Sequence, residues 1–176
     1  DRQNWSYSDQ QFDTALLQTL TPDSILFFNN SKVLKARIPL THAIVYSQKE
    51  TTNRTIQGEL LYLGATSAPW EYEFLVRPGS KITVGTVIRF DEHQFTVVAV
   101  SSYGRILSYQ WDIYAFLEYY GQLPLPPYVE YDPSKESQYQ PIMASLPWSV
   151  ASPTASLHFT QELLDKLSYK GVWLDY

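Results

Sequence analysis

Residues 149–167 read SVASPTASLHFTQELLDKL, and the two halves of this stretch differ in character. The second half predicts a helix, because Thr160 can cap its first turn and its leucines form an apolar stripe. Gly171 fits the left-handed residue that ends many helices. The first half carries four hydroxyl side chains, a proline and a histidine immediately before that helix. Free amides at a helix N-terminus bind anions, so the loop is a candidate small-molecule site. The alternative, favoured by these residues alone, is a loop whose hydroxyls satisfy its own backbone.

The composition is typical of a soluble globular protein. Of the 176 residues, 44% are hydrophobic and 18% are charged, which suffices for one domain with a sizeable core or for two small ones. The absence of cysteine excludes disulfides and thiolate metal sites. No apolar run reaches the length of a membrane span, and no secretory signal is apparent. We therefore expect a cytoplasmic protein with no membrane partner.

Charge is unevenly distributed along the chain. The net charge of -5 disfavours a general nucleic-acid binder. The segment 32–89 differs, because it carries eight basic and four acidic residues. A local basic surface is compatible with binding a phosphate backbone. It is equally compatible with a solvated sheet face, which is the commoner case.

Helical and extended patterns follow one another in three blocks. Ser8 and Gln11 suggest a capping box before a first helix, and residues 24–28 and 32–40 read as extended. Alternating patterns between turn signals then predict short strands at 42–46, 56–63, 71–76, 86–90, 95–100 and 105–109. The polar segments 47–55 and 131–137 are predicted to be loops. Residues 113–120 are predicted to form a helix that ends at Gly121. The proline-rich segment 123–128 is predicted to be extended.

This order predicts an α/β fold in which a small antiparallel β-barrel is inserted into a mixed α/β domain. The barrel should span residues 41–109. The α/β domain should be discontinuous, formed by residues 1–40 and 110–176, and is expected to be incomplete.

Common motifs for nucleotide and metal chemistry are absent from the sequence. It contains no Gly-x-Gly-x-x-Gly, no P-loop and no His-Glu-x-x-His, and its three histidines lack metal-ligand spacing, so we predict no metal. His158 could act as a general acid or base, although a structural histidine is the commoner alternative.

Two further groups of polar residues are candidates for binding. Asn29, Asn30 and Lys32 follow a buried strand, where ligands bind in α/β sheets; simple turn chemistry is the alternative. Arg77 precedes Pro78-Gly79 and is either a phosphate contact or an ordinary turn cation.

Several motifs, taken together and in order, resemble one known family. They are ILFFNNSKV at 25–33 with Ala36-Arg37, FLVRPG at 74–79, Gly121 with LPLPPY at 123–128, Tyr139-Gln140, VASPTASLHFT at 150–160 and KGV at 170–172. The resemblance is to the S-adenosylmethionine:tRNA ribosyltransferase-isomerase family of queuosine biosynthesis, and it covers nearly the whole chain.

The resemblance implies a fold and a reaction. The fold is an α/β domain with an inserted β-barrel. The reaction transfers the ribosyl moiety of S-adenosylmethionine to 7-aminomethyl-7-deazaguanine in the tRNA anticodon and isomerises it to epoxyqueuosine, releasing adenine and methionine. S-adenosylmethionine would be a consumed substrate, with no separate cofactor. The expected partners are this substrate and tRNA, and we expect a monomer.

The resemblance also implies roles for individual residues. His158 would transfer a proton. The substrate-binding residues would be Asn29, Asn30, Lys32, Arg37, Tyr139, Gln140, Ser152, Thr154, Ser156 and Phe159. The tRNA phosphates would be bound by Arg77 and Lys81, with Arg37 also available to them.

Departures from the family pattern support an alternative. Asn30 stands where the family has aspartate, and Lys32 replaces an arginine and so loses bidentate geometry. A family segment reading Thr-Leu-His-Val-Gly should follow Tyr176. The chain is therefore expected to be part of a longer protein or a divergent member. The alternative function is a non-catalytic relative or fragment that binds RNA or a protein partner.

Overall fold

The computed structural model describes residues 11–47, 50–126, 128–151 and 154–176. They belong to two units. Unit 1 draws on segments 1–32, 137–146 and 152–176, and unit 2 on segments 33–136 and 147–151. Both contain helices and strands, which confirms the predicted mixed α/β class.

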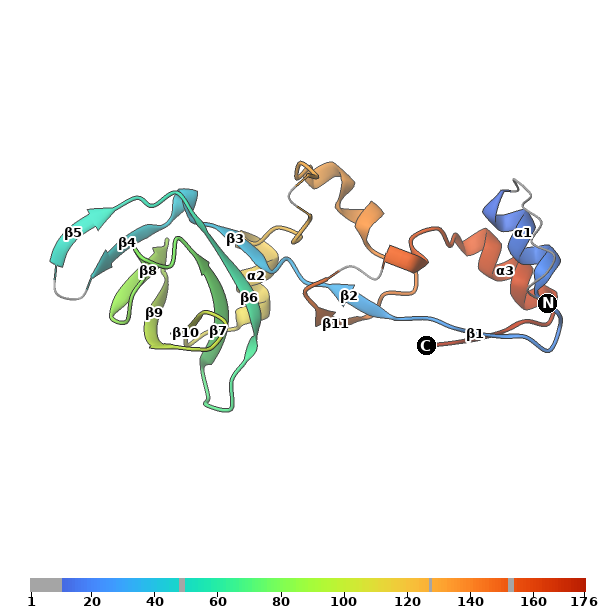
Figure 1. Cartoon of the computed structure of the whole chain (residues 1–176), viewed down its shortest axis with the longest axis horizontal. Coiled ribbons are helices and arrows are strands. Elements are labelled where there is room, and N and C mark those ends of the chain that lie inside the picture. Colours follow the sequence, from blue (N-terminus) through green and yellow to red (C-terminus); the bar gives the residue numbers. More distant parts are fainter. Residues whose placement is uncertain (1–10, 48–49, 127, 152–153) are drawn as a thin grey trace, which may run out of the picture. The chain divides into compact units, whose positions relative to one another are not determined.

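In the described part of unit 2, eight strands form one antiparallel sheet that curls into a half-barrel (Figure 1). In spatial order they are β3 (Arg37–Pro39), β6 (Glu59–Ala65), β7 (Glu71–Arg77), β10 (Arg105–Ser108), β9 (His93–Val100), β8 (Thr86–Phe90), β4 (Ile44–Ser47) and β5 (Glu50–Arg54). Burial follows the strand period of two: Leu60 and Tyr62 of β6 are buried and their neighbours are not. The strands predicted by alternation are confirmed, and the barrel is open between β3 and β5.

One segment of the sheet was wrongly predicted. Residues 47–55 were expected to form a loop, yet β5 pairs with β4 and brings Arg54 opposite Val45. Strand β5 lies at the edge of the sheet, where polar residues are common, so its sequence ETTNR shows no apolar alternation. Residues 40 and 42, which were expected to be extended, instead belong to the 3₁₀ helix η1 (Leu40–His42), which precedes β4.

Aromatic side chains form the centre of the unit 2 core. The rings of Phe95 and Tyr109 stack with centroids 4.2 Å apart and planes 8° apart. Phe116 meets Phe95 edge-on at 4.8 Å. It belongs to helix α2 (Ile113–Tyr120), which also packs against β3. Asp112 caps this helix, because its carboxylate accepts hydrogen bonds from the amides of Tyr114 and Ala115 at 2.9 and 3.3 Å.

A side chain at position 121, where α2 ends, would clash with neighbouring backbone atoms. The backbone of Gly121 approaches that of residue 35 so closely that a Cβ atom would lie 1.9 Å from the carbonyl oxygen of Lys35. The same atom would lie 2.4 Å from the carbonyl oxygen of Leu117. The φ of Gly121 is -87°, so a left-handed backbone conformation is not what requires glycine at this position.

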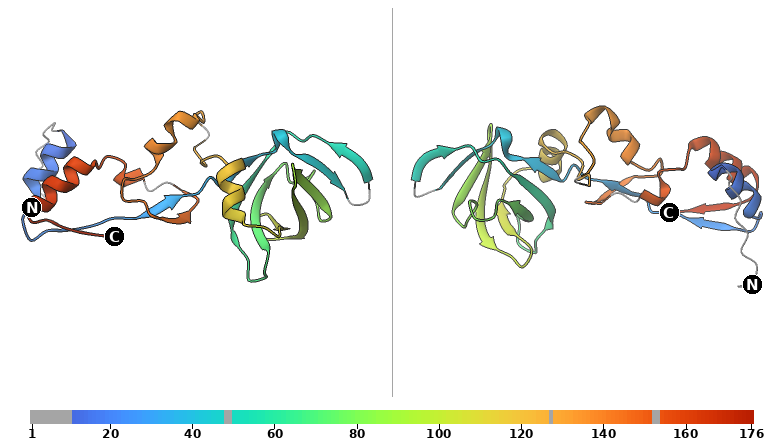
Figure 2. Two further views of the ribbon diagram at one scale, coloured as in Figure 1. Left: turned by 180° about the vertical axis from the view of Figure 1, so that it is seen from behind. Right: turned by 45° about the horizontal axis from the view of Figure 1, so that its top comes forward.

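Unit 1 pairs two helices and two short strands that lie far apart in the sequence. Helix α1 (Phe12–Thr19) lies beside α3 (Gln161–Tyr169), as both views of Figure 2 show. Strands β1 (Ile25–Phe27) and β12 (Trp173–Asp175) run parallel. Leu163, Leu167 and Val172 are buried between these elements. The helix predicted after Thr160 is confirmed, and Gly171 follows it at φ +89°.

The start of α1 differs from the expected capping box. Its N-cap is Gln11, which makes no side-chain capping bond, and Ser8 lies outside the described residues. In the parts of the chain that are described, no helix is both long and apolar enough to cross a membrane.

Short elements complete the structure. Strand β2 (Ser31–Val33) pairs with β11 (Leu146–Ser149), and η3 spans Thr154–Ser156. The 3₁₀ helix η2 (Pro133–Tyr139) occupies most of the segment that was expected to be a loop. Asp132 explains the difference, because its carboxylate accepts from the amide of Ser134 at 3.0 Å and so caps the turn.

Candidate functional site

The predicted site residues divide between the two units. Unit 2 contains Arg37, Arg77 and Lys81, and Ser152 lies outside the described residues. The others belong to unit 1, and they are Asn29, Asn30, Lys32, Tyr139, Gln140, Thr154, Ser156, His158 and Phe159. Most of the predicted substrate residues, and the histidine predicted to transfer a proton, therefore belong to a single unit.

The loop before α3 is held by capping and by aromatic packing. Thr160 accepts a hydrogen bond from the amide of Leu163 at 3.2 Å, which fixes the start of the helix. Phe159 meets Phe12 and Phe28 edge-on, with ring centroids 5.3 and 4.9 Å away. The exposed ring of His158 lies 5.6 Å from that of Phe12. Phe159 thus anchors the loop and leaves the adjacent imidazole accessible to solvent.

The hydroxyl residues of this loop differ in exposure. Ser156 is 6% exposed and is one of the few buried polar residues, whereas Thr154 is exposed. Thr154 accepts a backbone hydrogen bond from Leu157, which closes the η3 turn. Buried and exposed hydroxyls at this spacing fit both a capped loop and a polar binding loop.

The segment around Asn29 forms a defined turn. The Oδ1 atom of Asn29 accepts from the amide of Ser31 at 2.8 Å, as the turn interpretation expects. The carbonyl of Asn30 accepts from the amides of Ser145 and Leu146 at 2.8 and 3.1 Å. The backbone of residues 29–31 is thereby fixed, and Lys32 is exposed at its end.

Tyr139 ends the 3₁₀ helix η2 and Gln140 follows it, and both residues are half-buried. The amide of Gln140 donates to the carbonyl of Ser137 at 3.3 Å. These two residues therefore occupy a turn of fixed backbone within unit 1.

Arg37 and Arg77 share one carboxylate on the unit 2 sheet. Glu59 lies 3.3 Å from Nε of Arg37 and 3.8 Å from Nη1 of Arg77. The Arg37 backbone also exchanges two hydrogen bonds with Gln122, at 3.1 and 2.7 Å. Arg37 is the more buried of the two arginines, with 28% of its side chain exposed against 73% for Arg77. Arg77 is therefore the better placed to contact an anion from solvent.

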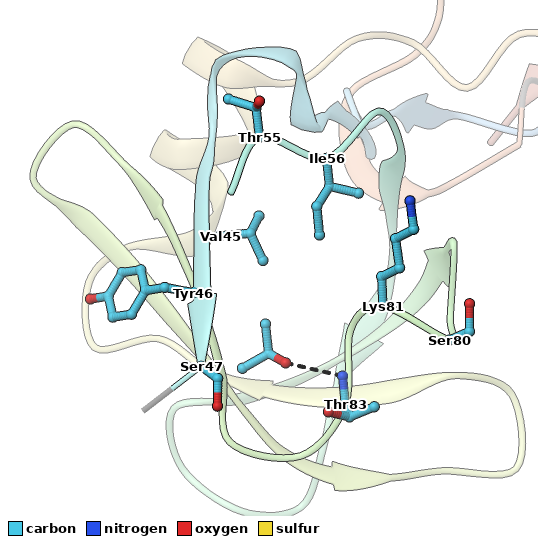
Figure 3. Close-up of a pocket in the computed structure, with 9 residues that line it drawn as sticks. Val45, Tyr46, Ser47, Thr55, Ile56, Ser80, Lys81 and Thr83 are labelled. Atoms are coloured by element: carbon cyan, nitrogen blue, oxygen red, sulfur yellow. Dashed lines mark hydrogen bonds between the residues drawn. The ribbon is translucent and has the colours of Figure 1, made fainter. Parts of the chain in front are cut away.

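Lys81 lines a cavity of about 450 Å³ in unit 2 (Figure 3). Val45 and Ile56 point into the space within the curled sheet, and Lys81 extends beside Ile56. Hydroxyl side chains supply most of the remaining lining, from Ser47, Thr55, Ser80, Thr83 and Thr86. The turn that carries Lys81 is fixed, because the amide of Thr83 donates to Oγ1 of Thr86 at 3.0 Å. The lining thus combines one ammonium group with several hydroxyls, and both kinds of group can bind phosphate oxygens.

Sequence reasoning selected Lys81 for its charge and missed the hydroxyls around it. Ser47 and Thr55 come from positions far from Lys81 in the chain, so no local motif joins them. Only the curl of the sheet brings them together.

An ionic network around Lys35 was also missed. Nζ of Lys35 lies 3.0 Å from Glu136 and 3.1 Å from Glu118. Burial opposes the charged form of Lys35, but hydrogen bonds to both carboxylates outweigh it and raise its pKa. The hydroxyl of Tyr131 donates to Glu136, and burial together with this bond raises the pKa of Tyr131 to about 12. The network fastens residues 131–136 to α2 and is structural in character.

Comparisons with known proteins give the chain a context. The whole chain, residues 1–176, matches the family described as "Queuosine biosynthesis protein". It is similar to the crystal structure of an S-adenosylmethionine tRNA ribosyltransferase from Thermotoga maritima, at 25% sequence identity and a TM-score of 0.36. The similarity covers 91% of this chain and 41% of the other, so this chain spans less than half the length of that solved relative.

Proposed function

Because the chain belongs to the queuosine biosynthesis protein family, we propose that the protein carrying it is an S-adenosylmethionine:tRNA ribosyltransferase-isomerase. It transfers the ribosyl moiety of S-adenosylmethionine to 7-aminomethyl-7-deazaguanine in the tRNA anticodon. Isomerisation then gives epoxyqueuosine, and adenine and methionine leave. S-adenosylmethionine is consumed as a substrate. The observation that carries this proposal is the family match over all 176 residues.

The proposal assigns substrate binding chiefly to unit 1. The loop before α3, with Thr154, Ser156 and Phe159, and the turn at Asn29 and Asn30 supply hydroxyl and amide groups. Ser152, Lys32, Arg37, Tyr139 and Gln140 complete the proposed set. His158 is proposed to transfer a proton, because its side chain is exposed on an anchored loop and histidine is the side chain that most often serves as a general acid or base.

The proposal assigns tRNA binding to unit 2. Arg77 is largely exposed, and Lys81 lines, together with several hydroxyl side chains, a cavity of about 450 Å³. Both residues fall in the basic segment 32–89. Phosphate contacts of this kind position a nucleic acid without reading its sequence.

Calorimetry tests the substrate assignment. S-adenosylmethionine should bind the intact gene product, and binding by the 176-residue chain as well would support a site within these residues. His158→Ala should lower turnover far more than S-adenosylmethionine affinity, whereas His42→Ala, at an exposed histidine of unit 2, should leave both unchanged. Equal losses of turnover and affinity in His158→Ala would reject the proton-transfer role.

The salt dependence of tRNA binding tests the second assignment. Lys81→Ala and Arg77→Glu should weaken binding, and Lys81→Ala should reduce the slope of log K against log salt by about 1. Lys166→Ala is the matched control, because it also removes one exposed lysine but belongs to α3 of unit 1. An unchanged slope in Lys81→Ala would reject the phosphate contact. Retained tRNA binding with no turnover by the intact gene product would favour the non-catalytic alternative, which the departures at Asn30 and Lys32 motivate.

A further inference from the structure

A second cavity in unit 2, of about 500 Å³, is bounded by α2 and by the turn between β8 and β9. We call it the aromatic pocket. Tyr109 and Phe116 in its lining are almost fully buried. Trp111 and Tyr119 also line it and are 51% and 79% exposed. It is distinct from the Lys81 cavity, because the two share no lining residue.

The rings of the aromatic pocket are held in place by packing and hydrogen bonds. The His93 ring lies between 5.4 and 6.0 Å from the rings of four neighbours, which are Tyr109, Trp111, Phe116 and Tyr120. Nδ1 of His93 lies 2.8 Å from the hydroxyl of Tyr109. The hydroxyl of Tyr120 donates to Asp91 at 2.7 Å. These contacts fix a preformed aromatic surface, so little ordering is needed when a ligand binds.

The charged groups that line the aromatic pocket are acidic. Asp91, Glu92 and Asp112 contribute carboxylates, and the lining includes no lysine or arginine. Their field reaches the buried rings: burial, with the charges of Asp112 and Glu92 adding to it, raises the pKa of Tyr109 to about 12. A phosphate, nucleotide or nucleic acid would meet repulsion here.

The side chains that line the aromatic pocket favour a weakly hydrated organic cation over a metal ion. Over the residues that the structure describes, no cluster of three or more His, Asp or Glu side chains could hold a metal ion. Aromatic faces attract cations that carry little bound water, and nearby carboxylates add Coulombic attraction. We propose that the aromatic pocket binds an organic cation whose charge is surrounded by methyl groups, as in a quaternary ammonium. This site is additional to the substrate and tRNA sites proposed above and does not depend on them.

Choline and its uncharged isostere 3,3-dimethylbutan-1-ol test the proposal on the intact gene product. The two molecules have nearly the same shape and differ in charge. Titration followed by calorimetry or by the NMR line width of the methyl groups should show choline binding at least about tenfold more tightly. Equal affinities would overturn the proposal, because the pocket would then be only hydrophobic. Failure of both to bind at millimolar concentration would overturn it as well.

Variants locate the binding. Trp111→Leu should weaken choline binding about tenfold, and Trp111→Phe should retain most of it because a ring face remains. Trp70→Leu is the matched control, because Trp70 is 55% exposed, lies in the same unit and does not line the pocket. Equal effects of Trp111→Leu and Trp70→Leu, in variants whose circular dichroism matches the wild type, would contradict the assignment.

Asp91→Asn tests the charge without removing the hydrogen-bond acceptor for Tyr120. Residue 91 lies at φ 48°, a conformation that asparagine also adopts, so the backbone should be preserved. Choline affinity should fall several-fold while affinity for the uncharged isostere stays constant. Loss of affinity for both ligands to the same extent would mean that the carboxylate only shapes the pocket.

The same chemistry can come from a free small molecule or from a methylated lysine on a protein. A short peptide with one trimethyllysine, compared with choline and with the unmethylated peptide, separates the two sources. Tighter binding of the trimethylated peptide would support the proposal with a protein as the source, and tighter binding of choline would support it with a free cation. A preference for the unmethylated peptide would contradict it, because a strongly hydrated ammonium would then be the better ligand.

Discussion

Unit 2 buries a continuous set of aromatic and aliphatic side chains from its curled sheet and α2, whereas the described core of unit 1 centres on Leu163, Leu167 and Val172. The residues proposed for substrate chemistry lie mainly in unit 1, and both cavities described above lie in unit 2. Elements with few buried contacts open more readily than core strands. The comparison leads us to expect unit 2 to open less readily than unit 1, which carries the loop proposed to hold the substrate.

The largest expected effect is on the aromatic core of unit 2. Phe95→Ala should lower the free energy of unfolding by about 3–5 kcal/mol, because it removes the ring stacked on Tyr109 and leaves a cavity. Urea denaturation followed by near-UV circular dichroism measures the loss. Hydrogen exchange should show the lost protection chiefly in unit 2. A loss below about 1 kcal/mol would mean that the core can collapse around the missing ring.

The next effect concerns the close approach at Gly121. Gly121→Ala should cost about 1–3 kcal/mol, because its Cβ atom would overlap the carbonyl oxygen of Lys35 and the backbone must shift. Gly79→Ala is the matched control in the same unit, since the atom nearest to its Cβ would lie 3.6 Å away. Thermal unfolding of both variants compares the two costs. Equal shifts in Tm would show that the effect on stability at both positions comes from backbone entropy and not from the overlap with Lys35.

A smaller effect is expected at the helix that follows the loop of unit 1. Thr160→Ala should destabilise unit 1 by about 1 kcal/mol, because the amide of Leu163 loses its acceptor. Thr160→Ser keeps the hydroxyl and should recover most of the loss. Exchange rates of the first amides of α3 report the effect directly. Should Ser and Ala behave alike, the hydroxyl contributes nothing and the loop is held by Phe159 alone.

The smallest effect is a pH dependence that belongs to unit 2. Because the pKa of Tyr131 rises to about 12 on folding, its stabilising contribution is complete below its unfolded pKa of about 10. That contribution is lost as the pH rises through the folded value, and Lys35, whose pKa is also raised, acts in the same direction. Tyr131→Phe should therefore show a shallower fall in unfolding midpoint between about pH 10 and 12 than the wild type. Parallel pH profiles would show that Tyr131 is not coupled to folding.

The sequence predicted those elements whose signals are local. Helix α2 follows from apolar spacing and its end at Gly121, and helix α3 follows from apolar spacing and the capping residue Thr160. The strands of the sheet follow from alternation. Strand β5 was missed because its residues are polar throughout, and β12 because a three-residue strand carries no periodicity of its own.

The candidate sites were predictable to a lesser degree, for a related reason. The loop before α3 was selected from its hydroxyl residues and from the motif resemblance, and Lys81 was selected for its charge. The hydroxyls around Lys81 and the rings around His93 come from separate strands and from α2, so they are joined only by the folded sheet. The sequence shows which side chains could bind a ligand, but only the folded structure shows which of them lie in the same cavity.

The pairing of β1 with β12 has a consequence for the order of folding during synthesis. Ile25 pairs with Trp173, so this contact closes a loop that contains the whole of unit 2. Unit 2 has all its residues once position 151 has left the ribosome, but the β1–β12 pair must await the residues at 173–175. Domains fold as units while translation proceeds, and closing a long loop carries an entropic cost that grows slowly with its length. We therefore expect unit 2 to be folded first on the ribosome, which shortens the effective loop that the nascent chain must close to complete unit 1.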